Sequence, residues 1–349
     1  MEKILVNRFE RHPVLWLVGI CILSVFFLEI CLRIANPSIL NFGLSFRQIN
    51  RYHPKWLLDY EPNSSSWIRL RGSGNVDYQN FLITINEHGF RCWDRALDNN
   101  LSDIQAGTKV IHAIGDSFTQ GWGLNYEASY PAFLDFILGD RIRVLNLGVN
   151  GFGTIGATGK SMALWDKIPA VLSIYLFISN DYDDDVRATE HSRRPGIVHT
   201  FLDIRNWFMQ HTYLGACPHA LAYWWRWPVN VGPKDLDDRK TFCQESQFEV
   251  RVGPPTNLRS DPNKGTMSKK AIREYREYLA QRGAGLVVLV LGPQDTSQDF
   301  YWFCREDGIE AHYFTVPEEL LLKREGHFNA LGNYQLARFV APLIRDKIR

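Results

Sequence analysis

The sequence lacks a surplus of charge of either sign. Its 349 residues contain 39 Lys and Arg against 38 Asp and Glu, a net charge of +1. Binding to nucleic acid phosphates needs a basic surface, so this balance argues against a nucleic-acid partner. Repeats of fixed period and low-complexity tracts are also missing, and nothing indicates a repeat architecture or a disordered tail.

Cysteines and histidines at metal-binding spacing are missing as well. None of the six cysteines forms a CxxC pair, and no HxxxH accompanies them. The pattern predicts no zinc site, and we expect neither a metal nor a cofactor. An oxidising compartment would allow cysteines outside the N-terminal apolar run to pair, and Cys217 with Cys243, which bracket one insertion, is the pair we favour.

One long apolar run stands near the N-terminus. Residues 14–28 are apolar apart from one glycine and one serine, and the run continues to Ala35 with only Glu29 and Arg33 interrupting it. About 20 such residues span a bilayer as a helix. Glu29 and Arg33 stand four apart, so they share a helix face and can neutralise each other near the headgroups. A buried helix of a soluble domain is the alternative.

Flanking residues favour an uncleaved anchor over a signal peptide. The small residues of a cleavage site do not follow the apolar run, and Lys3, Arg8 and Arg11 precede it. Basic residues favour a cytoplasmic position. We therefore expect a single-pass membrane protein whose main domain is exported to the periplasmic or extracellular side, with the lipid bilayer as one partner.

The remaining chain is long enough for one large domain with additions. Hydrophobic residues make up 45% of the sequence and aromatic residues 13%, enough for a full core. We predict a cytoplasmic stub and anchor over residues 1–35, a linker and N-terminal extension packing on the core over 36–105, and an α/β domain over 106–349. Residues 186–267 form an insertion in that domain.

Short apolar runs separated by amphipathic stretches predict an α/β fold. Strands are expected at residues 109–114, 143–147, 170–178, 285–291 and 311–315, and helices at 126–138 and 268–282. Continuous apolar strands of this kind suit a doubly wound, mostly parallel, five-stranded sheet covered on both faces. In such sheets the functional sites lie beyond the carboxyl ends of the strands.

The insertion combines an aromatic stretch with a loop rich in Pro, Gly and Asp. Residues 201–227 predict a Trp-rich helix whose aromatic side chains could face a membrane surface, line an acceptor groove or simply pack. Before it, the acidic residues around Asp181 are more typical of a solvated loop than of a cation site.

Four polar motifs follow the predicted strands. Gly115-Asp116-Ser117 places a serine at the first strand-to-helix turn, where an acyl nucleophile gains access and backbone donors. The alternative is a serine that merely caps a helix. The second strand ends before Gly151, the third before Asn180-Asp181, and His327 follows Glu325 near the last helix.

Taken together, these motifs resemble the SGNH or GDSL-type hydrolases, whose blocks bear the serine, glycine, asparagine and histidine in this order. Residues 86–91, Asn-Glu-His-Gly-Phe-Arg, are similar to a segment that precedes the serine block in membrane-anchored bacterial members. The resemblance implies a flavodoxin-like fold and an ester hydrolase or acyltransferase. It covers most of the chain from about residue 86.

The resemblance also implies roles for individual residues. Ser117 is the expected nucleophile, His327 the base, and Glu325 the group that orients the imidazole. The backbone N–H groups of Ser117 and Gly151 and the amide of Asn180 are expected to form the oxyanion hole. Asp116 and Asp181 are expected to support the site.

Two positions depart from the family pattern. The acid before the histidine is Glu325 where the family has aspartate, and Ile178 stands where the family has glycine. Both departures favour an alternative function, a non-catalytic membrane subunit that serves as a scaffold or assembly partner for other membrane proteins. For the enzyme, we expect an ester-bearing glycan, lipid or small molecule of the cell envelope as substrate.

Overall fold

The structure is a computed structural model that describes residues 12–35, 49–70, 79–93, 107–139, 141–215, 217, 250–255, 259–322 and 326–348. The chain divides into two compact units. Unit 1 comprises Met1–Gln48 and Asp203–Asn230, and unit 2 comprises Ile49–Leu202 and Val231–Arg349.

Unit 2 contains the predicted parallel strands. They are β6 (Lys109–Gly115), β7 (Ile142–Asn146), β8 (Leu172–Phe177), β10 (Gly285–Leu291) and β11 (Ala311–Thr315). They lie in the order β7-β6-β8-β10-β11, and each neighbouring pair is parallel. Numbered along the chain this is 2-1-3-4-5, the order of flavodoxin-like doubly wound sheets. The prediction of an α/β fold with a mostly parallel sheet is therefore confirmed.

The predicted strand number is too small for the whole sheet. In the described residues the sheet has nine strands, because antiparallel strands extend both edges. These are β3 (Ser65–Leu70), β4 (Gln79–Ile85) and β5 (Arg91–Cys92) beyond β7, and β9 (Arg251–Val252) beyond β11. β5 and β9 have two residues each, too few for an alternating pattern to show in the sequence. Strands β1 (Asn50–His53) and β2 (Leu57–Tyr60) form a separate hairpin.

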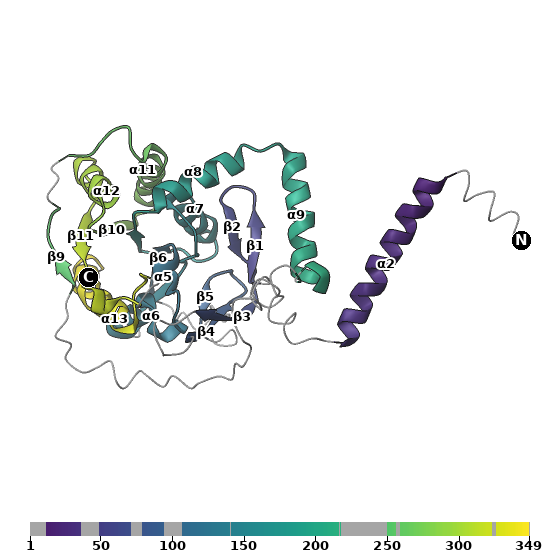
Figure 1. Ribbon diagram of the computed structural model, residues 1–349. Helices are drawn as coiled ribbons and strands as arrows, with labels where there is room; N and C mark the ends of the chain where they lie inside the picture. Colours follow the sequence, from purple (N-terminus) through teal and green to yellow (C-terminus); the bar gives the residue numbers. More distant parts are fainter. Residues whose placement is uncertain are drawn as a thin grey trace, which may run out of the picture. The chain divides into compact units, whose positions relative to one another are not determined.

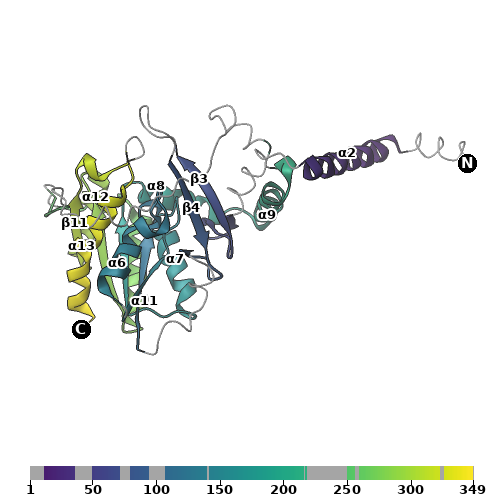
Figure 2. The ribbon, with the colours of Figure 1, turned by 90° about the horizontal axis from the view of Figure 1, so that it is seen from below.

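Helices cover both faces of the sheet (Figure 1). Helices α6 and α13 pack side by side on one face, as Figure 2 also shows, while α7, α8, α11 and α12 cover the other. Their bounds are α5 (Ser117–Gln120), α6 (Tyr130–Leu138), α7 (Thr154–Trp165), α8 (Asp181–Ser192), α11 (Thr266–Ala280), α12 (Asp295–Glu306) and α13 (Ala330–Lys347), with short 3-10 turns η2 (Tyr126–Ala128) and η3 (Glu318–Leu320).

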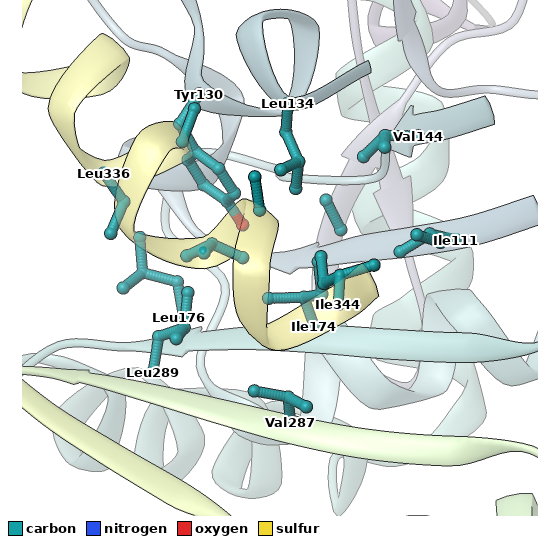
Figure 3. Packing of buried hydrophobic residues seen from close by; sticks show 14 of the residues in the cluster. Ile111, Tyr130, Leu134, Val144, Ile174, Leu176, Val287, Leu289, Leu336 and Ile344 are labelled. Atoms are coloured by element: carbon teal, nitrogen blue, oxygen red, sulfur yellow. The ribbon is translucent and has the colours of Figure 1, made fainter. Parts of the chain in front are cut away.

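Alternate residues of the central strands build the core beneath α6 and α13. Ile174 and Leu176 of β8 lie beside Val287 and Leu289 of β10, and all point to the same face. Figure 3 shows these side chains meeting α6 and α13. From the helices come Tyr130, Leu134, Leu336 and Ile344. The apolar runs seen in the sequence are thus buried on both faces, as a parallel sheet requires.

Unit 1 contains the apolar N-terminal helix. Helix α2 (Pro13–Ala35) has 23 residues and its most apolar stretch has a mean hydropathy of 2.6, so the helix is long and apolar enough to cross a membrane. None of that stretch is buried. Glu29 and Arg33 form the predicted ion pair, with 2.9 Å between Nε and Oε1.

The Trp-rich helix differs from its predicted bounds. Helix α9 runs over Gly196–His211, so it begins earlier and ends earlier than the predicted 201–227. It ends where the Thr212 hydroxyl accepts the backbone N–H of Gly215 at 2.9 Å and starts a new helical turn. Residues 218–227 lie outside the described residues.

A buried ion pair ties the β1–β2 hairpin to α7. The Lys160 ammonium lies 2.6 Å from the Asp59 carboxylate and donates to the carbonyl of Gly89 at 2.6 Å. Burial alone would raise the pKa of Asp59, but the charge and hydrogen bond of Lys160 lower it. Both side chains are 6% exposed, so neither charge has water to replace a lost partner.

Removing one member of this pair should therefore be costly. Lys160→Met leaves the buried Asp59 carboxylate with only the exposed Arg51 as counter-ion, 3.2 Å away, and we expect a loss of at most about 3–5 kcal/mol in the free energy of unfolding, measured with urea. The matched control is Lys270→Met, which breaks an exposed pair with Glu274 and should cost about 1 kcal/mol or less. Equal losses in the two variants would contradict this assignment.

Candidate active site

The predicted motifs meet at the carboxyl end of the sheet because of the strand order. Strand β6 lies between β7 and β8, so the turn after β6 has the turns after β7 and β8 as its neighbours. Ser117 follows β6, Gly151 follows β7 and Asn180 follows β8. The order reverses between β6 and β8, which is where doubly wound sheets bind their ligands.

The turn that bears Ser117 is fixed by close packing. A Cβ at Gly115 would lie 2.3 Å from the Thr119 hydroxyl and 2.9 Å from the carbonyl of Leu176, so only glycine fits there. Asp116 then caps α5, since its carboxylate accepts the backbone N–H of Phe118 at 2.9 Å. Ser117 is the first residue of this four-residue helix and is 6% exposed.

The structure brings Ser117 and His327 together across 210 residues of chain. Nε2 of His327 lies 2.8 Å from the Ser117 hydroxyl oxygen. This is the distance over which an imidazole can take the proton of a nucleophilic hydroxyl.

An antiparallel bridge between Leu321 and Phe328, just before α13, positions the histidine. The N–H of Leu322 donates to the carbonyl of His327 at 2.6 Å, and the N–H of Asn329 donates to that of Leu320 at 2.9 Å. The side chain of Asn329 also caps α13 by accepting the N–H of Gly332 at 2.9 Å.

Aromatic rings surround the imidazole. The Phe118 ring lies 4.7 Å from the His327 ring between centroids, and the Trp122 ring lies 6.4 Å from it. Phe118 also meets Phe328 edge to face at 4.9 Å. These contacts restrict the imidazole to few orientations, which helps to keep Nε2 directed at the hydroxyl.

Glu325, the predicted orienting acid, lies outside the described residues. The described chain ends at Leu322 and resumes at Gly326, one residue before His327. Its role stays a prediction from the sequence.

The two other predicted oxyanion donors both lie at the surface. Gly151 has a φ of 80°, which favours glycine, and a Cβ there would meet no atom within 4 Å, so the turn is open to a ligand. The amide of Asn180 donates to the Asp184 carboxylate at 2.8 Å. Because an amide nitrogen has two hydrogens, this contact fixes the side chain and leaves one donor for a substrate.

Asp116 lies beside the nucleophile as well as capping its helix. The Ser117 hydroxyl is 3.0 Å from Oδ2 of Asp116 and has a single hydrogen to give, so Asp116 and His327 compete for it. Burial raises the pKa of Asp116 to about 7, and the nearby charge of Asp184 adds to this effect. Near neutral pH a share of the molecules holds Asp116 protonated, which frees the serine hydrogen for His327.

The acidic stretch after β8 is not the solvated loop that the sequence suggested. It forms the first turns of α8, and Asp181, Asp184 and Asp185 are buried. Asp181 accepts the Tyr175 hydroxyl at 2.5 Å, and Asp185 accepts the N–H of Ile155 at 2.8 Å. Burial and the nearby charge of Asp116 raise the pKa of Asp181 well above its ordinary range. These carboxyl groups are internal hydrogen-bond partners that fix α8 on the sheet.

No metal cluster accompanies them: in the part of the chain that the structure describes, no three His, Cys, Asp or Glu residues are arranged to hold an ion. Ile178, the departure from the family pattern, is buried in the core, and its N–H lies 3.4 Å from Asp181 Oδ2.

The Asn-Glu-His-Gly-Phe-Arg segment at residues 86–91 supports the serine turn. Its last residue, Arg91, is fully buried and donates to the carbonyls of Gln120, Gly121 and Leu124 just after Ser117, at 2.5 to 2.9 Å. Burial lowers the pKa of Arg91 to about 10. The guanidinium thus holds the end of α5, a long-range contact that only the position of an arginine in a motif could have indicated.

Two further residues, His112 and Cys217, have no contact with Ser117 or His327 among the described hydrogen bonds. His112 is buried in β6, as expected of a core histidine, and its Nδ1 lies 2.8 Å from the Ser161 hydroxyl. Cys217 is a free thiol in the structure, and Cys243, the partner that we favour for it, lies outside the described residues.

No family model and no curated protein matches the sequence. Solved structures to which the chain is similar include a putative lipolytic protein of the G-D-S-L family from Desulfitobacterium hafniense DCB-2, with a TM-score of 0.38 and 15% identity over 69% of this chain and 100% of that one. Another is AlinE4, an SGNH-hydrolase family esterase, with a TM-score of 0.34 and 16% identity over 70% of this chain and 99% of that one.

A third is a carbohydrate acetylesterase family member from Sinorhizobium meliloti, with a TM-score of 0.33 and 15% identity over 69% of this chain and 99% of that one. Because these TM-scores are below 0.5, the functional conclusion rests on the geometry of the site.

The raised pKa of Asp116 predicts a pH-dependent stability. The folded protein disfavours the ionised form of Asp116. The resulting loss of folding stability is absent below pH 3.8, the ordinary pKa of the group, and grows until the pH passes about 7. Asp116→Asn keeps the cap and cannot ionise. We expect the free energy of urea unfolding of this variant to rise relative to wild type between about pH 4 and pH 8, by at most about 4 kcal/mol. A difference independent of pH would contradict the assignment.

Proposed function

We propose that the protein is a serine ester hydrolase or O-acyltransferase of SGNH type. The observation that supports this most is the 2.8 Å contact between the Ser117 hydroxyl and His327 Nε2 at the carboxyl end of the sheet. A serine that merely capped a helix would have no need of an imidazole, and the cap of α5 is supplied by Asp116 instead.

The proposed reaction has two halves. Ser117 attacks the acyl carbon while His327 takes its proton, and the same imidazolium then protonates the alkoxide that leaves as an alcohol. In the second half, water or an acceptor hydroxyl attacks the acyl-serine while His327 takes its proton. The imidazolium then returns that proton to the Ser117 oxygen as the acid or the new ester leaves. Both outcomes use the same residues, and the choice depends on whether water is excluded.

The charge that develops on the carbonyl oxygen needs donors. We assign them to the backbone N–H groups of Ser117 and Gly151 and the amide of Asn180, each typically worth about 3 kcal/mol in the barrier. The hydrogen bond from Asn180 to Asp184 supports this assignment because it holds the amide in place before a substrate arrives. Glu325 is assigned to orient His327, although its carboxylate is one methylene longer than aspartate.

Helix α2 supports a membrane location. Its length and exposed apolar surface suit a single-pass anchor with the remaining chain exported, and an acylated glycan, lipid or other envelope ester would then be the substrate. A non-catalytic scaffold is the second candidate, which the buried Ile178 in place of glycine favours. The contact between Ser117 and His327 favours the enzyme.

An activated serine should react with a fluorophosphonate probe. We expect the detergent-solubilised full chain to be labelled, and Ser117→Ala to abolish the label, as judged by gel fluorescence. The matched control is Ser161→Ala, because Ser161 also contacts a histidine, His112, at 2.8 Å but is fully buried and cannot meet the probe. Unlabelled wild type would favour the scaffold, and a label that persists in Ser117→Ala would remove Ser117 from the mechanism.

The role of Glu325 in orienting His327 can be tested with the amide variant Glu325→Gln. The uncharged amide of Glu325→Gln cannot stabilise the positive charge of the imidazolium. We therefore expect kcat for an acetyl ester to fall by about 10²-fold or more while KM changes little. Glu319→Gln, which changes an exposed residue of η3, should leave both constants unchanged. If kcat survives in Glu325→Gln, another group orients His327.

A further inference from the structure

Helix α9 has an apolar stripe that faces solvent. Ile197, Phe201, Ile204 and Phe208 recur at every third or fourth residue, so they lie along one side of the helix. Their exposed fractions are 68%, 66%, 59% and 38%. Trp207 flanks them and is 59% exposed. We call these five residues the α9 stripe.

The stripe is not the side of α9 that contacts strand β1. His199 lies within hydrogen-bonding contact of the Tyr52 hydroxyl in β1, and its ring lies beside that of the buried His191. Val198 and Leu202, which flank this contact, are half-buried. One apolar side of α9 is therefore partly covered, and a second apolar side is exposed to water.

The end of α9 is hydrogen bonded to the apolar helix α2 within unit 1. The Glu29 carboxylate accepts the backbone N–H groups of Tyr213 and Leu214 at 3.0 Å each. The Arg33 guanidinium donates to the carbonyl of His211 at 2.6 Å. If α2 spans the bilayer, its charged pair marks the headgroup level, and these bonds place the end of α9 there as well.

The charges near the stripe suit anionic headgroups. Arg193 and Arg194 immediately precede α9, Arg205 lies within it, and all three are exposed. Asp203 is the one acidic residue in the helix. An amphipathic helix with arginines beside its apolar stripe and with exposed tryptophan and phenylalanine side chains is typical of segments that lie in the interface plane of a membrane.

We propose that the α9 stripe lies in the membrane interface and binds lipid directly. The proposal rests on the anchoring of α2 that the proposed function includes. It adds a second attachment, in which the apolar side chains enter the acyl boundary while the arginines meet the headgroups. With α2 alone the exported part could rotate about one chain, whereas two attachments restrict its orientation toward the bilayer.

A photo-crosslinking amino acid tests which chemistry covers the stripe. The full chain, with p-benzoylphenylalanine in place of Phe201 or Ile204, is reconstituted into nanodiscs of phosphatidylethanolamine and phosphatidylglycerol, irradiated, and analysed by mass spectrometry for lipid adducts. The matched control replaces Asp203, an exposed residue of the same helix outside the stripe. Replacing Phe26, exposed in the middle of α2, reports on the anchor itself.

We expect adduct yields at positions 201 and 204 to approach that at position 26 and to exceed that at position 203 severalfold. Adducts at 26 with no excess at 201 and 204 over 203 would overturn the proposal while leaving the anchor intact. No adduct at 26 would show that the anchor is wrong and would overturn the proposal with it. Irradiation of native membranes that joins position 201 to a protein and not to lipid would assign the stripe to a protein partner and overturn the proposal.

Discussion

The close approach of α5 to the ends of β7 and β8 is the constraint on which the site depends. A Cβ at Gly148 would lie 2.3 Å from the backbone nitrogen of Gln120, and one at Gly115 would strike Thr119. These two glycines thus allow the serine turn to pack closely against the ends of β7 and β8, where Ser117 is only 6% exposed. At that depth the hydroxyl has little water around it, and a hydrogen bond to His327 is stronger than it would be at the surface.

A helix as short as α5 needs support at both ends, because one turn cannot offset its own nucleation cost. Asp116 caps the N-terminal end, where the helix dipole is positive, and the Arg91 guanidinium meets the carbonyls at the C-terminal end, where it is negative. The two charges bracket Ser117 without a direct ion pair between them. This explains how a motif that precedes the serine by some 30 residues can belong to the same site.

The parts of this structure that the sequence predicted are those with local signals. Apolar runs identified the five parallel strands, and the motif order brought Ser117 and His327 to one edge of the sheet. The burial of Asp181 and Asp185 could not be foreseen, because their partners Tyr175 and Ile155 come from other elements and a row of acids resembles a solvated surface. Likewise, two-residue strands such as β5 have no period to detect and exist only through their neighbours.

Glu29 and Arg33 show how charges can be kept in an apolar helix. In the membrane anchor that we propose, either charge alone would oppose insertion of α2, but the ion pair between them removes the net charge. Each also bonds backbone groups beyond α2: Glu29 takes two N–H groups at the start of a helical turn, and Arg33 donates to the carbonyl of His211, where α9 ends. These are backbone groups that a helix leaves without partners inside the helix, and leaving them unpaired would be unfavourable in the membrane interface that we propose. Glu29 and Arg33 therefore lower the mean hydropathy of α2, but they also supply hydrogen-bond partners to the backbone at the end of α9.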